Sequence, residues 1–226
     1  DRWILNGQKV WTTHAHQAHM MIALVRTGEP GGKRHEGLSQ FLVDLKSPGV
    51  TVRPIVDLAG DVHFNEVFFD DVAVPHDMLL GTEGQGWQQC TSELSLERSG
   101  PERYLSSHAL FVELLRAASP ASQAQRIEIG RITAELWTLR QMSFAVAGRL
   151  ANGQDPALEA AIVKDLGNSF EQALPRRVQA LLDDGLALHD DAPLARVLAL
   201  LLQVSPSFSL RGGTREILRG IIARGL

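Results

Sequence analysis

The chain has almost no cysteine and no long apolar run. Cys90 is the one cysteine among 226 residues, so no internal disulfide can form, as is usual for proteins of a reducing cytoplasm. The longest apolar run, VLALLLQV at 197–204, is much shorter than the roughly 20 residues of a membrane-spanning helix. We therefore expect a cytoplasmic protein without a membrane span.

Neither positive nor negative charge is in large excess. Lys and Arg number 22 against 26 Asp and Glu, which gives a net charge of −4, and the basic residues are spread along the chain. Nucleic-acid binding relies on clustered positive charge, so the sequence predicts no nucleic-acid partner. Hydrophobic residues make up 44%, enough to bury a sizeable core in one large domain or two modest ones.

The first 84 residues carry the signals of an antiparallel β-domain. Short runs rich in Val, Ile and Phe alternate with Gly and Pro at 20–27, 38–45, 50–56 and 66–74. The Asn6-Gly7 pair, between the strand-like runs RWIL and QKVWTT, is typical of the two-residue turn of a β-hairpin. We therefore predict a β-domain over 1–84 that opens with a hairpin.

After residue 85 the apolar residues recur at three- and four-residue steps, which is the period of an amphipathic helix. Gly100-Pro101 is expected to interrupt the first helical stretch, since proline lacks an N–H and clashes with the preceding turn. Asn152-Gly153 is expected to end a second, cleaner helix. Several helices joined by short loops predict an up-down α-helical bundle over 85–226, so the fold class is α+β.

Four stretches of the sequence, in this order, resemble the flavin-dependent acyl-CoA dehydrogenase family. They are LNGQKVWTT at 5–13, VFFDDVAVPHDMLLGTEGQGW at 67–87, ELSLER at 93–98 and GGTREILRGIIARGL at 212–226. Their order and spacing carry the resemblance, which covers the whole chain. It leaves the family's N-terminal helical domain and the first part of its β-domain unaccounted for, so we expect the natural protein to continue upstream.

The resemblance implies the α,β-dehydrogenation of an acyl-CoA thioester. In this reaction a base removes the α-proton while the β-hydrogen leaves as a hydride to N5 of FAD. Such an enzyme passes its electrons to an electron-transferring flavoprotein and works as a homo- or hetero-oligomer. We therefore expect FAD as the cofactor, an acyl-CoA as the substrate and these two kinds of protein partner.

Two segments are expected to hold the FAD. Trp11 and Thr13 lie two residues apart on a strand, so their side chains share one face, and similarity to the family places them against the isoalloxazine. The alternative is an edge-strand Trp packed on a loop beside an exposed Thr. Similarity to the family also places Gly213, Thr214 and Glu216 around the flavin nucleotide, because a glycine turn at a helix N-terminus suits a pyrophosphate. The alternative there is a well-capped terminal helix.

The catalytic base is the residue that departs from the commonest family pattern. Many members carry a glutamate directly before the Gly-Thr pair, but Gly212 stands there in this chain and has no side chain to accept a proton. In the branch that lacks this glutamate, the base precedes an arginine on the first bundle helix, where this chain has Glu97-Arg98. The resemblance thus implies Glu97 as the base, enclosed by apolar residues and substrate, and Arg98 as a contact to the CoA portion. A surface Glu-Arg pair is the alternative, and Glu93 and Glu102 are poorer candidates.

Two segments lack a family feature. The Arg-x-x-Phe-Gly segment that reaches the flavin of a neighbouring subunit is replaced by residues 118–130, and a Gly-Gly-rich segment is replaced by 186–196. These changes resemble divergent bacterial members, some of which pair two unlike subunits and act on bulky acyl-CoAs, including steroid side chains. Two other functions therefore stay open. One is a non-catalytic subunit that completes the flavin site of an active partner, and the other is an acyl-CoA oxidase-like enzyme that reduces oxygen directly.

The segment HAHQAH at 14–19 raises the question of a metal site. His14 and His16 are spaced to share one strand face, and His19 follows at the end of the strand. Zinc sites usually combine such histidines with a cysteine or carboxylate pattern, which the neighbouring sequence lacks. We therefore predict no metal and interpret these residues as loop and edge-strand histidines next to the flavin segment.

Overall fold

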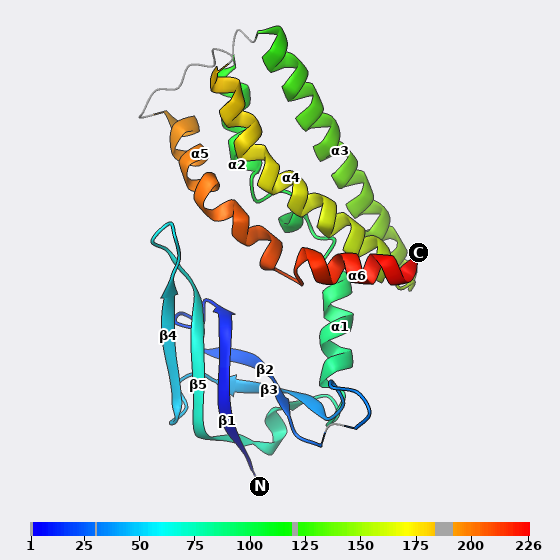
Figure 1. The fold of residues 1–226 in the computed structure, drawn as a ribbon. Helices are drawn as coiled ribbons and strands as arrows, with labels where there is room; N and C mark the ends of the chain where they lie inside the picture. The colour runs from blue at the N-terminus through cyan, green and yellow to red at the C-terminus, as the bar shows by residue number, and fades with distance from the viewer. Residues whose placement is uncertain (1, 30, 119–121, 184–191) are drawn as a thin grey trace. The chain divides into compact units, whose positions relative to one another are not determined.

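The computed structural model describes residues 2–29, 31–118, 122–183 and 192–226. The chain divides into two compact units, Asp1–Ser92 and Glu93–Leu226, each of which has its own core. The first unit holds the strands and the second holds the helical bundle, and helix α1 (Gly86–Glu97) carries the chain from one to the other (Figure 1). Most of the departing segment 186–196 lies outside the described residues.

Within its described residues, the first unit has six strands in two antiparallel sheets. β1 (Arg2–Thr13), β5 (Val62–Pro75) and β4 (Val50–Val56) form one sheet in the order β1-β5-β4. β2 (Met20–Arg26), β3 (Leu38–Asp44) and β6 (Leu79–Leu80) form the other in the order β2-β3-β6, and the 3-10 turn η1 (His76–Met78) links β5 to β6. The strands therefore lie where the Val, Ile and Phe runs predict them.

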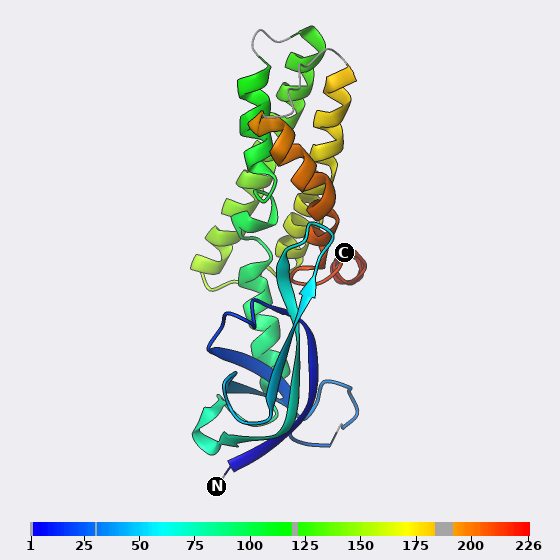
Figure 2. The same cartoon turned by 90° about the vertical axis from the view of Figure 1, so that its left-hand side faces the viewer.

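One buried cluster joins side chains from both sheets, because each strand turns alternate residues inward. Figure 2 shows the backbone of the two sheets. β3 contributes Phe41 and Val43, and β5 contributes Val67, Val72 and Val74, all of which are at most 2% exposed. This core fixes the strands whose ends carry the predicted flavin segment at 11–13.

The predicted hairpin at Asn6-Gly7 is wrong, because β1 runs through this pair without a turn. The pair instead forms a bulge: the pairing of β1 with β5 shifts register between Leu5 and Gly7, and Gly7 has a φ of 134°. The Asn6 side chain donates to Oδ1 of Asp71 at 2.9 Å and accepts from the Asp71 N–H at 2.8 Å. Since a bulge also uses a positive-φ glycine, the local signal does not distinguish it from a hairpin turn.

The second unit is built from helices and 3-10 segments. Its elements are the end of α1, η2 (Pro101–Arg103), α2 (His108–Ala117), α3 (Gln123–Ala151), α4 (Ala157–Asp183), α5 (Pro193–Val204), η3 (Ser205–Leu210) and α6 (Arg215–Gly225). α1 stops before Gly100-Pro101 and α3 stops before Asn152-Gly153, as predicted. The α+β fold class, with a helical bundle after the sheets, is confirmed.

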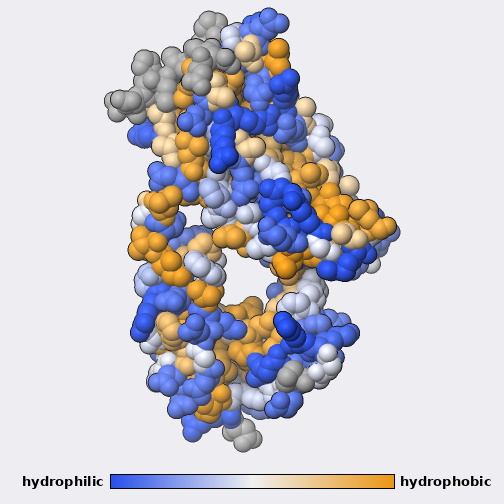
Figure 3. Space-filling model, in the orientation of Figure 1, coloured by the Kyte–Doolittle hydropathy of each residue, from blue (hydrophilic) through white to orange (hydrophobic). Residues whose placement is uncertain are grey.

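The bundle core forms where α2, α4 and α5 pack together and α3 covers them. Its fully buried members include Leu114 of α2, Leu174 of α4 and Ile132 of α3. The other side of α3 exposes large apolar side chains, among them Trp137 at 59% and Phe144 at 57%. Apolar surface also gathers around the C-terminal end of α6 (Figure 3). The bundle thus leaves several apolar areas uncovered on its outside.

One segment of the described chain, Pro193–Leu210, is long and apolar enough to cross a membrane by length and composition alone. It comprises α5 and η3, and one face of α5 buries Leu194, Leu198 and Leu201 in the bundle core. Packing within the bundle accounts for part of the apolar character of this segment, whereas Leu200, Leu202 and Leu210 are exposed.

Candidate functional site

A two-glycine turn leads into α6. Gly212 has a φ of 61° and Gly213 a φ of 103°, a left-handed backbone that residues with side chains rarely adopt. Thr214 takes the N-cap position of α6, but its hydroxyl bonds to the Glu216 carboxylate and not to a helix N–H. Hydrogen bonds, first from its own backbone N–H and then from Thr214, hold the pKa of Glu216 below its usual value.

The end of α1 meets this turn. Nε of Arg98 donates to the carbonyl oxygen of Gly212 at 2.9 Å, and Arg98 is only 8% exposed. A Cβ at position 212 would lie 3.8 Å from Cγ of Arg98 and 3.3 Å from Cε of Lys164. The structure therefore brings Arg98, the residue after Glu97, to position 212, where the sequence lacks the expected glutamate. The contact of Arg98 with CoA stays a prediction.

Glu97 is the last residue of α1, and 47% of its side chain is exposed. Its carboxylate pairs with Nη2 of the buried Arg103, whose Nε also donates to the Glu97 carbonyl oxygen at 3.3 Å. In the chain alone, the carboxylate is thus held by a guanidinium and open to solvent, whereas the sequence predicts enclosure by apolar residues and substrate. The role of Glu97 as the base stays a prediction.

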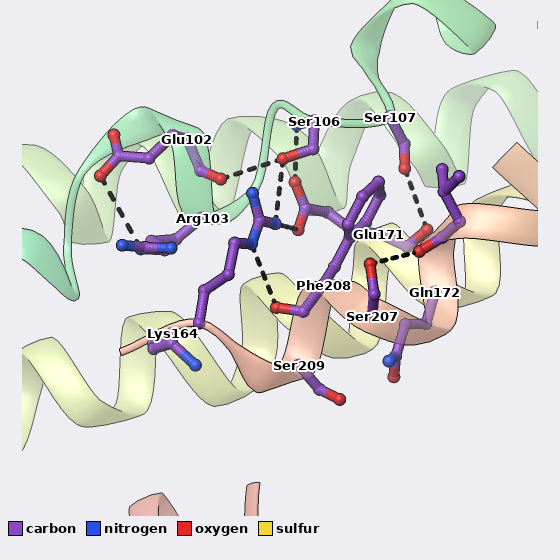
Figure 4. A network of polar contacts seen from close by, with 12 residues as sticks. Glu102, Arg103, Ser106, Ser107, Lys164, Glu171, Gln172, Ser207, Phe208 and Ser209 are labelled. Atoms are coloured by element: carbon purple, nitrogen blue, oxygen red, sulfur yellow. Dashed lines mark hydrogen bonds and ion pairs between the residues drawn. The ribbon is translucent and has the colours of Figure 1, made fainter. Parts of the chain in front are cut away.

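The inner face of α4 carries a polar row that the sequence motifs do not include. Lys164, Asn168 and Glu171 are each 0% exposed, and Figure 4 shows Lys164 and Glu171 on the same helix. Steps of four and three residues place the row on one face of the helix. This spacing is the signal that could have revealed it, since polar residues at core positions need buried partners.

Lys164 holds the second glycine of the turn. Its Nζ donates to the carbonyl oxygen of Gly213 at 2.7 Å. With its amide oriented so that both ends are satisfied, Asn168 accepts from Nζ of Lys164 at 3.1 Å and donates to the Phe208 carbonyl at 3.2 Å. Burial first, and then the charges of nearby arginines, lower the pKa of Lys164 to about 8. The residue is therefore an ammonium at neutral pH, but it loses its proton more readily than an exposed lysine does.

Glu171 joins α4 to two other segments of the bundle. Its Oε1 accepts from the Ser106 N–H at 2.6 Å, and its Oε2 accepts from Nη2 of Arg211 at 3.2 Å (Figure 4). Burial raises the pKa of Glu171, while the hydrogen bonds from Ser106 and the charges of Arg211 and Arg103 oppose that rise. The carboxylate thus ties α4 to the start of α2 and to the residue directly before the two-glycine turn.

In the first unit, the end of β1 carries the other segment predicted to hold FAD. The pairing of β1 with β5 shifts register between Lys9 and Thr12, and Trp11 within this bulge has a φ of 61°. Trp11 is 61% exposed and packs edge-to-face on Phe64, with 6.0 Å between the ring centroids. Thr13 pairs directly with Phe64 across the two strands, so Trp11 and Thr13 have this neighbour in common. Their contact with FAD stays a prediction.

The histidines that follow β1 contact other residues of the same unit. The ring of His14 packs edge-to-face on that of His63 at 4.5 Å between centroids, and Nδ1 of His16 lies 3.1 Å from Oδ1 of Asn65. Among the residues that the structure describes, no group of three or more His, Cys, Asp and Glu side chains could hold a metal ion. The predicted absence of a metal in the whole protein stays a prediction.

We expect Gly212→Ala to lower the free energy of unfolding by about 2 kcal/mol. A φ of 61° disfavours any side chain, and the new Cβ would also stand 3.3 Å from Cε of the buried Lys164. Gly153→Ala is the matched control, because Gly153 has a φ of 71° and nothing within 4 Å of its Cβ position. Denaturant unfolding of the two variants measures the difference, and equal losses would mean that Lys164 does not crowd position 212.

The chain matches two models of one protein family. Residues 1–72 match "Acyl-CoA dehydrogenase, middle domain", and residues 84–226 match "Acyl-CoA dehydrogenase, C-terminal domain". Among solved structures, the one described as "Tcur3481-Tcur3483 steroid ACAD" has a TM-score of 0.85 at 22% identity, covering 100% of this chain and 61% of that chain. At this identity the likeness shows the fold.

Two curated relatives are similar in sequence. The chain is 31% identical to acyl-CoA dehydrogenase FadE34 of Mycobacterium tuberculosis over 226 residues, which are 99% of this chain and 31% of that protein. It is 42% identical to acyl-CoA dehydrogenase IpdE1 of the same organism over 166 residues, which are 70% of this chain and 41% of that protein. The chain thus spans less than half the length of each of these relatives, and it belongs to the acyl-CoA dehydrogenase family.

Proposed function

We propose that the protein containing this chain is a FAD-dependent acyl-CoA dehydrogenase in which Glu97 removes the α-proton of the substrate. The observation that carries this proposal is the hydrogen bond from Arg98 to the Gly212 carbonyl, which keeps the end of α1 at the turn before α6. A family member without a carboxylate at position 212 needs one close by, and Glu97 directly precedes Arg98. Membership of the family supports an oxidoreductase that acts on CH–CH bonds.

In this proposal the Glu97 carboxylate accepts the α-proton. Arg103 is its ion-pair partner in the chain alone, and 5% of the Arg103 side chain is exposed against 47% for Glu97. The carboxylate therefore has more freedom to turn toward a substrate than the guanidinium has. An acyl chain bound over Glu97 excludes water, which strengthens the hold of the carboxylate on a proton and makes it a better base.

The chain has residues suited to a flavin nucleotide in each unit. In the second unit, the Thr214 N–H at the start of α6 has no acceptor within the described residues, and a helix N-terminus favours phosphate oxygens. Gly213 directly precedes Thr214, and Glu216 lies in the first turn of α6. In the first unit, the exposed Trp11 and Thr13 offer a ring and a hydroxyl to a planar aromatic ligand. Bound FAD supplies the hydride acceptor.

A second function, the non-catalytic subunit, is favoured by the ion pair between Glu97 and Arg103. A carboxylate that is half exposed and paired with a guanidinium is a weaker base than an enclosed one. In this case the chain completes the flavin site of an unlike, active subunit. The description of one structural relative, "Tcur3481-Tcur3483 steroid ACAD", names two components and a steroid. It therefore supports an assembly of two unlike subunits and a bulky or steroid acyl-CoA as substrate.

Apolar surface on the bundle supports an oligomer in either case. Trp137 and Phe144 of α3 are exposed, and the Arg140 guanidinium lies over both rings, at 5.3 and 4.9 Å from their centroids. A groove of about 500 Å³ between α3 and α4 is lined in part by Leu139 and Phe170. Exposed apolar patches of this kind mark protein interfaces. An electron-transferring flavoprotein completes the proposal as the partner that receives the electrons.

The visible absorption spectrum of the full-length protein, purified alone, tests the first function. We expect the absorption band of a bound flavin, because Gly213, Thr214 and Glu216 in one unit and Trp11 and Thr13 in the other are present in one chain. A folded but colourless protein would contradict this function and favour the non-catalytic subunit. Return of the band on mixing with an active partner subunit would then support that second function.

A further inference from the structure

The buried ammonium of Lys164 takes no part in the proton transfer proposed above. Lys164 is 0% exposed, and its Nζ donates to the Gly213 carbonyl at 2.7 Å. Arg98 likewise donates to the carbonyl of the preceding residue, Gly212, at 2.9 Å. Two buried cations from different segments therefore fix two successive carbonyl groups of one turn.

The carbonyl held by Lys164 belongs to the same peptide group as the Thr214 N–H. In a trans peptide the C=O and N–H bonds point in opposite directions, so this N–H points away from Lys164. Within the described part of the chain, nothing accepts a hydrogen bond from it. Gly212 and Gly213, with φ values of 61° and 103°, give this backbone unusual freedom. The direction of the N–H is thus fixed mainly by the hydrogen bond to Lys164.

We propose that Lys164 is a positioning residue of the flavin-nucleotide site, which fixes the Gly213–Thr214 peptide so that the Thr214 N–H faces the phosphate groups of the ligand. This inference rests on the proposed function, because it takes the flavin nucleotide as the ligand at the start of α6. Lys164 itself points into the bundle and does not touch the ligand. It acts through the peptide that it holds, and its positive charge adds to the attraction for an anion.

The surroundings of Lys164 support a role beyond folding. Positive side chains face it from three other segments: Arg98 directly after α1, Arg103 on η2 and Arg211 before α6. Glu97 and Glu102 pair with Arg103, and Glu171 pairs with Arg211. Asp165 lies beside Lys164 on the same helix, but among the described residues no carboxylate forms an ion pair with Lys164 or Arg98. A buried cation without an ion-pair partner of its own costs stability. A bound anion offsets this cost.

A pair of α4 variants in the full-length protein tests the inference. Lys164→Met removes the donor and the charge but keeps the length of the side chain. Gln172→Met is the matched control, since Gln172 of the same helix also donates to a backbone carbonyl, that of Pro206 at 3.1 Å, away from the turn. The readouts are the dissociation constant of FAD, from quenching of flavin fluorescence, and hydrogen exchange at the Thr214 amide.

We expect Lys164→Met to weaken FAD binding about tenfold or more, as for the loss of one charge-assisted contact. With FAD added, hydrogen exchange at Thr214 should become faster than in the unsubstituted protein, and the affinity for riboflavin, which has no phosphate, should change little. Gln172→Met should leave both FAD affinity and exchange unchanged. Unchanged FAD affinity in a folded Lys164→Met protein would overturn the inference, and so would equal losses for FAD and riboflavin. If the unsubstituted protein binds no FAD, the proposed function fails, and the inference falls with it.

The pH dependence of FAD affinity in the unsubstituted protein is a test that does not depend on the folding of a variant. Lys164 loses its charge as the pH rises through about 8, the pKa to which its surroundings lower it. The charged groups that face Lys164 are Arg98, Arg103, Arg211, Asp165 and Glu171. FAD affinity should therefore fall as the pH rises from about 7 to about 9. An affinity that is constant across this range would overturn the inference.

Discussion

Glu97→Gln is expected to lower kcat by about 10²–10⁴-fold, the usual contribution of a positioned general base. Glutamine has the shape of glutamate and can still accept a hydrogen bond from Arg103, which pairs with Glu97 in the structure, but it cannot take up the α-proton. The loss should lie in kcat and not in FAD content, because Glu97 is not among the residues assigned to the flavin. Steady-state turnover of the complete assembly, together with its flavin-to-protein ratio, measures both.

Glu93→Gln is the matched control for this experiment. Glu93 is exposed and lies one helical turn earlier on α1, so the same chemical change there should leave turnover nearly unaffected. A Glu97→Gln protein with full turnover would remove Glu97 from the role of base. With FAD still bound, that result would also favour the second function, in which an unlike subunit carries the base.

Glu171→Leu is expected to lower the free energy of unfolding by about 3–5 kcal/mol, the usual effect of removing one partner of a buried ion pair. The Glu171 side chain is 0% exposed, and its loss leaves the Ser106 N–H and one bond of Arg211 without their acceptor. A loss of this size corresponds to a melting temperature lower by on the order of 10 °C in a domain of this size. Thermal and denaturant unfolding of the full-length protein measure it.

Glu159→Leu provides the comparison for a solvent-exposed pair. Glu159 of α4 pairs with Arg149 of α3, and their side chains are 36% and 45% exposed. Because water screens such a pair, we expect a change below about 1 kcal/mol. Equal losses from the two substitutions would mean that the Glu171 network contributes no more to the bundle than a surface pair does.

The regular elements of the fold could be predicted from the sequence because their signals are local. Runs of Val, Ile and Phe place β2 to β5, and the three- and four-residue apolar period places the bundle helices. The breaks at Gly100-Pro101 and Asn152-Gly153 follow from the chemistry of proline and from a glycine with a positive φ of 71° at position 153. Each of these features depends on residues a few positions apart.

Features that depend on a distant partner could not be predicted in this way. The bulge at Asn6-Gly7 is fixed by Asp71, 65 residues later, so the pair alone reads as a hairpin. The polar row of α4 depends on the same kind of distant contact. The spacing of the row predicts that its polar side chains are buried, but it does not identify their partners: Lys164 finds its acceptor at Gly213, 49 residues away.

The candidate site has features of both kinds, some local in the sequence and some that depend on a distant partner. The missing side chain at Gly212 and the Glu97-Arg98 pair are visible in the sequence, and their relation is suggested by the family pattern. Their proximity is a property of the folded bundle, in which Arg98 reaches the Gly212 carbonyl across 114 residues of sequence. The pairing of Glu97 with Arg103 could not be predicted from the sequence either, since an arginine six residues after a glutamate is also common near an exposed helix end.

The most direct test of the account is the anaerobic addition of acyl-CoA to the flavin-loaded, full-length protein, followed by visible absorption. The set of substrates should include straight-chain, branched and steroid-side-chain thioesters, because the residues described do not select among them. We expect at least one of them to bleach the flavin band of the unsubstituted protein, while the band of Glu97→Gln persists. A bound flavin that stays oxidised with every thioester, or a Glu97→Gln protein that bleaches as fast as the unsubstituted one, would contradict it.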